Sequence, residues 1–268
     1  MNNISANQII ILTIYLSTLY VIERRKIIDY NDEYKKEAKC SLIVMSGSLL
    51  TKFIGSPLLF LIASHIEKYK FFDFQMPALV RLILVFILVD FAYYVFHRTA
   101  HQVRLLWASH SVHHTPNVMQ VTAALRLGWG AVIPGQIIFL SPLLLIGIRA
   151  DEIFGILSLN LFYQYWLHTE VIRKLPNFIE YLFNTPSHHR VHHGRNDIYK
   201  NKNFGGILII FDRLFGSFQK EEESIKIKYG RSVPIKSYNP FFVAFHEWIS
   251  IYKDTTNYLT RKVKRISN

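Results

Sequence analysis

The residues of this sequence with the clearest chemical potential are its histidines, most of which fall into three tight clusters. They are, in chain order, His97-Arg-Thr-Ala-His101, His110-Ser-Val-His113-His114 and His188-His189-Arg-Val-His192-His193. His168 lies between the second and third clusters. Neutral imidazole is a good ligand for zinc, copper, iron and nickel. The clusters therefore predict a metal site.

The spacing within the clusters suits a helical metal site. Residues four apart on a helix share a face with Cβ atoms about 6 Å apart, so His97 and His101 can bind one ion. The H-x-x-H-H pattern adds a neighbouring pair, such as His113 and His114, which can address two ions. Nine or ten ligands exceed one tetrahedral zinc and fit two ions with five or six ligands each. Iron would use open positions for oxygen, and zinc remains an alternative.

Several other classes of site are excluded by the sequence. The single cysteine, Cys40, rules out an intramolecular disulfide and cysteine-based zinc or iron–sulfur centres. The zinc protease motif H-E-x-x-H is absent, because Arg98 follows His97. There is no nucleophile elbow, phosphate loop or dinucleotide fingerprint, so electrons must come from a separate donor. The isolated His65 and His246 are interpreted as structural.

The elements that must position the histidines are long apolar segments. Half of the 268 residues are hydrophobic and the mean hydropathy is +0.17. Five segments approach the length of about 20 residues that crosses a bilayer. They are residues 6–22, 41–66, 77–96, 130–148 and 153–167. With such segments present, the formal charge of +12 indicates a face against anionic lipid and not a nucleic-acid partner.

The charge distribution predicts the topology. The basic segment 23–39 is expected in the cytoplasm, which places the N-terminus outside. Counting crossings from there, the third and fifth spans both end at the cytoplasmic side. His97 and His168, which follow those spans, are then expected at one surface. Glu221–Glu223 is interpreted as a solvated run, and the basic stretch Arg261–Arg265 is expected at anionic headgroups.

The predicted fold is an all-α integral membrane protein with a helical transmembrane bundle of about four to five spans. A cytoplasmic helical domain caps the bundle and holds a histidine-rich dimetal site. The predicted divisions are residues 1–76 (membrane helices and a basic cytoplasmic loop), 77–230 (catalytic domain) and 231–268 (cytoplasmic tail). The protein is thus expected to be multi-pass, with its catalytic site and C-terminus in the cytoplasm.

The three clusters, in this order, resemble the fatty acid hydroxylase / sterol desaturase superfamily over about Phe86 to Gly230. Trp166-Leu-His168-Thr169-Glu170 and Phe211-Asp212-Arg213-Leu214-Phe215-Gly216 look most like its alkylglycerol monooxygenase branch and bacterial relatives. The resemblance implies nine metal ligands. They are His97, His101, His110, His113, His114, His168, His189, His192 and His193.

Five further polar residues are candidates for the site. The resemblance makes Gln164 a candidate ligand, and His188 adjoins the third cluster. Asp90 lies inside an apolar segment, where acids are costly and usually functional. It could orient a histidine, pair with an arginine or join two helices. Glu170 and Asp212 could accept hydrogen bonds from ligand histidines or form structural ion pairs.

The resemblance implies a membrane-bound non-haem diiron oxygenase that hydroxylates a lipid: a fatty acyl, alkyl-ether or sterol-like chain. It would use O₂ and an external donor: a reduced pterin, a ferredoxin or a haem electron carrier. Three alternatives stay open: a lipid desaturase, a non-enzymatic membrane metal-binding protein and an inactive lipid-binding relative. Two departures bear on activity, because Gln102 stands where relatives often carry Glu and Asn201 where they often carry Asp.

Overall fold

The computed structural model describes residues 6–27, 31–130 and 135–266, without the side chains of residues 6–14, 16 and 263–266. This part of the chain is helical, and its β-type pairing is limited to two isolated bridges. The α-helices are α1 (Ala6–Lys26), α2 (Asp32–Glu67), α3 (Ala78–Ala100), α4 (Arg104–His110), α5 (Gly135–Leu145), α6 (Ala150–Tyr165), α7 (Asn177–Leu182), α8 (Pro186–His192), α9 (Ile210–Leu214) and α10 (Pro240–Ile266). Two 3₁₀ turns, η1 (Val121–Leu125) and η2 (Asp197–Tyr199), complete the set. The all-α prediction is confirmed.

Helices α2 and α3 are long and apolar enough to cross a membrane. Helix α2 begins at Asn31, whose side chain accepts hydrogen bonds from the backbone N–H groups of Glu33 and Tyr34. The apolar side chains of α2 and α3 point outward: Phe53 of α2 is 80% exposed and Leu79 of α3 is 68% exposed. A helix in the core of a soluble protein would bury such side chains. The two helices therefore indicate membrane association.

The predicted count of four to five spans is only partly reflected in the helices. The first predicted span coincides with α1, but most of its side chains lie outside the described residues. The fourth corresponds to α5, which has 11 residues. The fifth corresponds to α6, which has 16. At 1.5 Å per residue both are shorter than a hydrocarbon core of about 30 Å, so their crossing stays a prediction.

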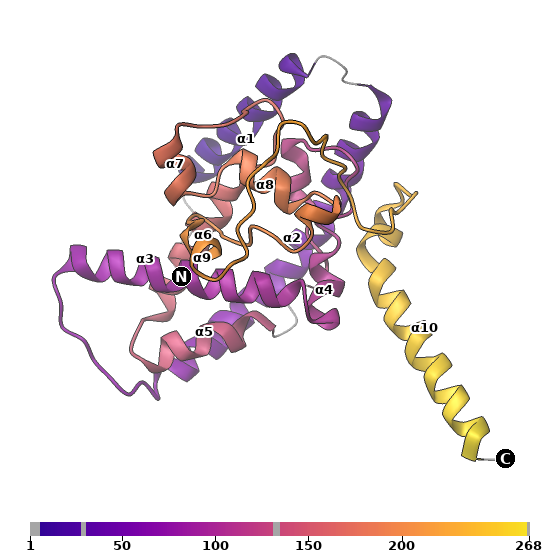
Figure 1. Cartoon of the computed structure of the whole chain (residues 1–268). Helices are drawn as coiled ribbons and strands as arrows, with labels where there is room; N and C mark the ends of the chain where they lie inside the picture. The colour runs from indigo at the N-terminus through magenta and orange to yellow at the C-terminus, as the bar shows by residue number, and fades with distance from the viewer. Residues whose placement is uncertain (1–5, 28–30, 131–134, 267–268) are drawn as a thin grey trace.

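The bundle core lies where α2, α3, α5 and α6 meet. Val89 of α3, Leu144 of α5 and Ile153 of α6 are fully or almost fully buried there. Helix α5 starts beside Leu106, and the carbonyl of its last residue, Leu145, accepts from the N–H of Phe71 before α3. Helix α5 thus runs antiparallel to α3, and the chain then returns through α6. Figure 1 shows the short helices α8 and α9 gathered beside α3 and α6.

A buried ion pair ties α2 to the turn that carries the second histidine cluster. The Arg126 guanidinium is 1% exposed and lies 2.6 Å from the Glu37 carboxylate. It also donates to the hydroxyls of Ser41 and Thr115. Thr115 follows His114 directly, so this network fixes the turn against α2. A buried guanidinium needs such a set of acceptors.

The C-terminal region, predicted as a tail, contains the long helix α10. Its first turns pack against α2 and α4, where Val243 and Ala244 are buried. Glu247 pairs with Arg104 at 3.1 Å and with Arg231 at 2.6 Å. Its later turns extend away from the rest of the chain (Figure 1).

Candidate metal centre

The histidines of the site come from five places in the chain. The end of α3, the end of α4, the turn after α4, the turn after α6, and α8 each supply at least one imidazole. The nine histidines with implied ligand roles lie together. They form two groups: His97, His101, His110, His114 and His192 in the first, and His113, His168, His189 and His193 in the second. Within each group, one nitrogen from every imidazole lies within 4.8 Å of the others.

Backbone carbonyls fix the tautomers of three imidazoles. Nδ1 of His97 is 2.8 Å from the Phe204 carbonyl, and Nδ1 of His168 is 2.8 Å from the Gln164 carbonyl. Nδ1 of His192 is 3.0 Å from the Lys202 carbonyl. A carbonyl only accepts, so each Nδ1 carries the proton and each Nε2 keeps its lone pair. This arrangement orients an imidazole for a metal.

The remaining nitrogens converge in a way that hydrogen bonds cannot satisfy. Nε2 of His189 lies 2.8 Å from Nε2 of His168 and 3.1 Å from Nε2 of His193. A neutral ring nitrogen offers either one proton or one lone pair, so it cannot serve both neighbours. Nε2 of His192 and of His101 are buried without a hydrogen-bond partner. A cation at the centre of each group would satisfy these lone pairs, so the residues fit a metal such as iron.

Burial keeps these imidazoles in the neutral form that binds metal. It lowers the pKa of His192 to about 4, although the hydrogen bond to the Lys202 carbonyl opposes the shift. Burial likewise lowers the pKa of His168 to about 3. For His114 and His193, burial and the neighbouring imidazoles together hold the pKa well below its usual range. At neutral pH the site therefore presents lone pairs and not positive charge.

The segment that supplies two of the three carbonyls is held by buried carboxylates. Asp212 accepts from the N–H groups of Phe204 and Gly205, at 2.8 and 2.7 Å, and from the Ser217 hydroxyl. Its side chain is fully buried. Since the Phe204 carbonyl accepts the proton of His97, Asp212 positions that imidazole through the backbone. It does not touch a histidine of either group.

Asp90 has a similar role one step further from the site. Its carboxylate accepts from the N–H groups of Ile207 and Leu208 and from the amide of Asn160. Asn160 in turn accepts from the side chain of Gln164, whose carbonyl holds His168. Among the three roles considered for Asp90, the helix–helix hydrogen bond is present. Pairing with an arginine or direct contact with a histidine is not found among the described residues.

Asp212→Asn is expected to weaken metal binding without removing it. The amide keeps one acceptor but brings an NH₂ group against a backbone N–H, which leaves a buried donor unsatisfied at a cost of about 1–3 kcal/mol. Losing a hydrogen-bonded support of a ligand typically lowers metal affinity about 10–100-fold. Competition with a chelator for Fe²⁺ measures the change. Asp197→Asn, at an exposed pair with Lys200, is the matched control, and equal affinity in both variants would contradict the role of Asp212.

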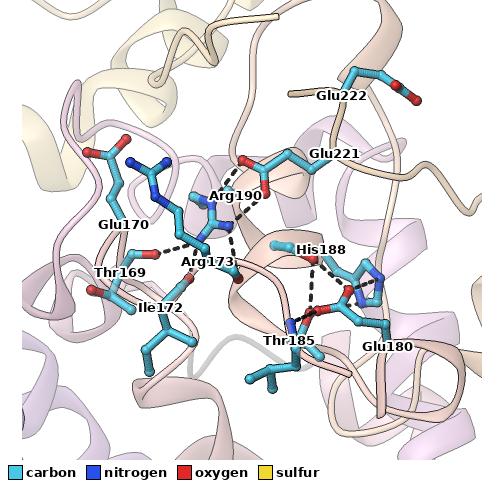
Figure 2. Close-up of polar contacts among 12 residues, drawn as sticks. Thr169, Glu170, Ile172, Arg173, Glu180, Thr185, His188, Arg190, Glu221 and Glu222 are labelled. Carbon is cyan, nitrogen blue, oxygen red and sulfur yellow. Dashed lines mark hydrogen bonds and ion pairs between the residues drawn. The ribbon is translucent and has the colours of Figure 1, made fainter. Parts of the chain in front are cut away.

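The third cluster is anchored to the segment after His168 by Arg190. Its guanidinium, 2% exposed, forms two hydrogen bonds with the Glu221 carboxylate at 3.0 and 2.7 Å. It also donates to the carbonyls of Thr169 and Ile172, at 2.9 and 2.7 Å, and of Arg173. Figure 2 shows Arg190 between these partners. The interpretation of Glu221 as a solvated residue is wrong, because its charge neutralises a buried arginine.

His188 lies outside both groups, although it adjoins His189. Its Nε2 is 2.9 Å from the Glu180 carboxylate, and its Nδ1 is 3.3 Å from the Thr185 hydroxyl (Figure 2). Glu180 also accepts from the Ser187 hydroxyl. Burial raises the pKa of Glu180, but its hydrogen bonds, led by that from His188, outweigh burial and bring the pKa to about 2. Both nitrogens of His188 are occupied, so this residue supports the start of α8.

Two other candidates are also occupied by protein partners. Gln164 accepts from the Tyr93 hydroxyl at 3.0 Å and donates to Asn160, so both ends of its amide are used. Glu170 accepts from the hydroxyls of Tyr229 and Tyr34, at 2.9 and 3.4 Å. In the described part of the chain, neither side chain forms a hydrogen bond with a histidine, and Gln164 holds His168 only through its backbone carbonyl.

The two departures from the family pattern lie on the surface. Gln102 and Asn201 are exposed, and no hydrogen bond links either side chain to a site imidazole among the described residues. Asn201 has a φ of 56°, in the left-handed region that asparagine tolerates well. The expectation that these positions change the hydrogen bonding of the ligands is therefore not supported by their placement.

Sequence reasoning gave no role to Arg190, Glu180 or the carbonyl-bearing segment 202–204. The signal for Arg190 was its place between two histidine pairs on one short helix, where a charged side chain must be buried with them. Glu180 carried no recognisable signal, since its partners become neighbours only in the fold. The carbonyls of Lys202 and Phe204 carry none at all, because every residue has a carbonyl group.

Fold and site together define a helical, membrane-associated protein with a histidine-rich site that fits metal ions. The sequence model of the fatty acid hydroxylase family matches residues 82–217, just over half of the chain. The chain therefore belongs to the fatty acid hydroxylase family. The match covers all nine histidines of the two groups.

Three curated relatives show how far the similarity extends. The chain is 42% identical to alkylglycerol monooxygenase of Homo sapiens over 187 residues, which are 69% of this chain and 41% of that protein. It is 44% identical to alkylglycerol monooxygenase of Danio rerio over 163 residues, 60% of this chain and 35% of that protein. It is 27% identical to ornithine lipid hydroxylase of Rhizobium tropici over 223 residues, 76% of this chain and 66% of that protein. The chain thus spans less than half of the alkylglycerol monooxygenases it matches, and no solved structure matches it.

Proposed function

We propose that this protein is a membrane-bound, non-haem diiron oxygenase that hydroxylates a lipid chain with O₂ and external electrons. The observation that carries the proposal is the pair of imidazole groups, in which more ring nitrogens converge than hydrogen bonds between the rings can satisfy. The relatives, which are alkylglycerol monooxygenases and an ornithine lipid hydroxylase, support a lipid substrate.

The two imidazole groups would each hold one iron. The first offers five nitrogens, from His97, His101, His110, His114 and His192, and the second offers four, from His113, His168, His189 and His193. A six-coordinate iron would keep one open position in the first group and two in the second. When bound, the iron pair supplies the redox chemistry that activates O₂ for attack on a C–H bond.

The protein's own residues hold the imidazoles and keep them neutral. The carbonyls of Phe204, Gln164 and Lys202 fix the protons on Nδ1. The ring of Phe204 lies 5.1 Å from that of His101, and the Trp107 ring lies 5.0 Å from it. These aromatic side chains cover one side of the first group and help exclude water from it.

The membrane arrangement follows from the same proposal. Helices α2 and α3 would cross the bilayer, with α5 and α6 completing a multi-pass bundle. The basic segment 23–39, at the end of α1 and the start of α2, would lie in the cytoplasm together with the site and the C-terminus, and the N-terminus outside. A lipid chain could then reach the site from the bilayer, and a separate carrier or a reduced pterin could deliver electrons from the aqueous side.

Anaerobic purification with metal analysis, followed by O₂ consumption assays, tests the function. The purified protein in nanodiscs is expected to hold iron and to consume O₂ with one member of a panel: an alkylglycerol, an ornithine lipid or a phospholipid. Each lipid is tested with a reduced pterin and with a ferredoxin. Mass spectrometry of the product distinguishes a gain of one oxygen atom from the loss of two hydrogens, which would indicate a desaturase. Zinc without iron, together with no turnover, would contradict the proposal.

A further inference from the structure

The apolar stripe of helix α10 touches the protein at its start, where the rings of Phe241 and Phe245 each lie 5.4 Å from that of Trp129, and is exposed further along the helix. Phe241, Phe245, Tyr252 and Leu259 recur at helical spacing and share one face. They are 65%, 40%, 70% and 53% exposed. The ion pairs of the helix with the protein, which are described below, come from its opposite side. In a helix that belongs only to a soluble fold, the apolar face would be the buried one.

Polar groups hold α10 in this orientation. Glu247 of α10 pairs with Arg104 of α4 at 3.1 Å, and Asp254 pairs with the same guanidinium at 2.6 Å. The nearby Val243 is completely buried in a small cluster with Cys40 and Val44 of α2. Rotating the helix to bury its stripe would break both ion pairs. The outward direction of the stripe is therefore built into the fold.

The position of α10 matches the boundary of a bilayer. It contacts α2 near Val44, where the basic stretch of that helix gives way to its apolar stretch. It contacts α4 directly after the end of α3. These contacts place α10 at the same end of both candidate membrane helices, and Figure 1 shows it running crosswise to α3. A helix in this place would lie along the membrane surface.

The charges of the outer half fit an anionic surface. Lys253, Arg261 and Lys262 are exposed on α10. An amphipathic helix with basic residues beside an apolar face binds in the plane of a membrane with its apolar face about 5–10 Å into the headgroup region. Anionic lipids add attraction for each basic residue near the surface.

We propose that α10 is an in-plane membrane helix, with the stripe of Phe241, Phe245, Tyr252 and Leu259 inserted into a leaflet that contains anionic lipid. The proposal does not depend on the catalytic activity. It assigns the C-terminal region a defined partner, the bilayer surface beside α2, and explains why an amphipathic helix projects from the bundle with the outer part of its apolar face, at Tyr252 and Leu259, uncovered.

Site-specific fluorescence of the full chain in nanodiscs tests this assignment. In a Cys40→Ala background, an environment-sensitive dye is attached at Tyr252→Cys, Leu259→Cys or Asn257→Cys. Asn257 is the matched control, because it lies two residues from Leu259 on the other face. With phosphatidylglycerol in the disc, we expect blue-shifted emission at 252 and 259, quenching by doxyl lipids and loss of quenching by iodide. The dye at 257 should stay open to iodide.

Three outcomes would overturn the proposal. If iodide quenches all three positions equally in discs with and without phosphatidylglycerol, the helix lies in water. Dyes at positions 252 and 259 could be shielded from both iodide and doxyl lipids. If this shielding disappears with one chain per disc, the stripe packs against a second copy of this chain. If Lys253→Gln, Arg261→Gln and Lys262→Gln together leave the doxyl quenching in phosphatidylglycerol discs unchanged, anionic lipid is not the partner. Iron content equal to that of the unmodified chain verifies that each labelled variant is folded.

Discussion

His192→Ala is expected to abolish stable metal binding by the first imidazole group. His192 is buried, its Nδ1 proton is donated to the Lys202 carbonyl, and its Nε2 has no hydrogen-bond partner among the described residues. Losing a residue that only supports a ligand costs about 10–100-fold in metal affinity, so losing a ligand should cost at least about 100-fold. Iron per chain after anaerobic loading and desalting, measured by mass spectrometry, is the readout.

The control for this variant is another buried imidazole outside the two groups. His246 of α10 is 7% exposed, and its Nδ1 lies 2.8 Å from the Val243 carbonyl oxygen. His246→Ala removes a similar volume of buried ring, and we expect it to retain the iron content of the unmodified chain. If His192→Ala also keeps full iron, His192 is not a ligand. If both variants lose iron equally, the loss reflects damage to the fold.

Arg190→Met is expected to destabilise the protein strongly and to lower its iron content at the same time. The guanidinium makes five hydrogen bonds, and its removal leaves the Glu221 carboxylate and three carbonyls without their donor. Removing one partner of a buried pair costs about 3–5 kcal/mol. The change is measured as the apparent melting temperature in detergent, with and without added Fe²⁺.

Two comparisons separate the role of Arg190 from a general loss of charge. Arg173→Met removes an exposed arginine from the same region and should leave the melting temperature unchanged. Arg190→Lys keeps the charge but cannot form the two parallel hydrogen bonds to Glu221, so it should fall between the unmodified chain and Arg190→Met. If Arg190→Met has the same melting temperature as Arg173→Met, the hydrogen-bond network of Arg190 does not anchor α8.

The membrane helices illustrate what could be predicted from the sequence and what could not. Hydropathy located α3 and the apolar part of α2 closely, because a long run of apolar side chains depends only on the residues themselves. It did not register that α2 begins at Asp32, in the basic segment that was predicted as a loop. It also extended the fourth span to residue 148, beyond the end of α5 at Leu145, since apolar residues continue into the turn between α5 and α6. Residues 146–149 turn because Gly147 adopts a φ of 100°, which places it against the Phe72 carbonyl. Hydropathy averages do not register such a turn.

For the histidines, too, part of the arrangement could be predicted from the sequence and part only from the fold. Their types and spacing determined that the protein has an imidazole-rich site, because positions three and four apart on a helix must share a face. Adjacency of His113 and His114 predicted that neighbours would address different centres, and the structure places these two in different groups. The same adjacency does not separate His188 from His189. Only the position of Glu180 in the fold turns His188 away from the site.

The sequence by itself thus determined the chemistry available to this protein: neutral nitrogen ligands near the ends of apolar helices, with a single cysteine and no recognisable nucleophile motif to compete. The tertiary structure alone decided which nitrogen of each imidazole faces the centre and which polar residues support it. The physical reason is that an imidazole takes its tautomer from its hydrogen-bond partner. For His97, His168 and His192 that partner is a backbone carbonyl, a group that every residue carries and no sequence pattern marks.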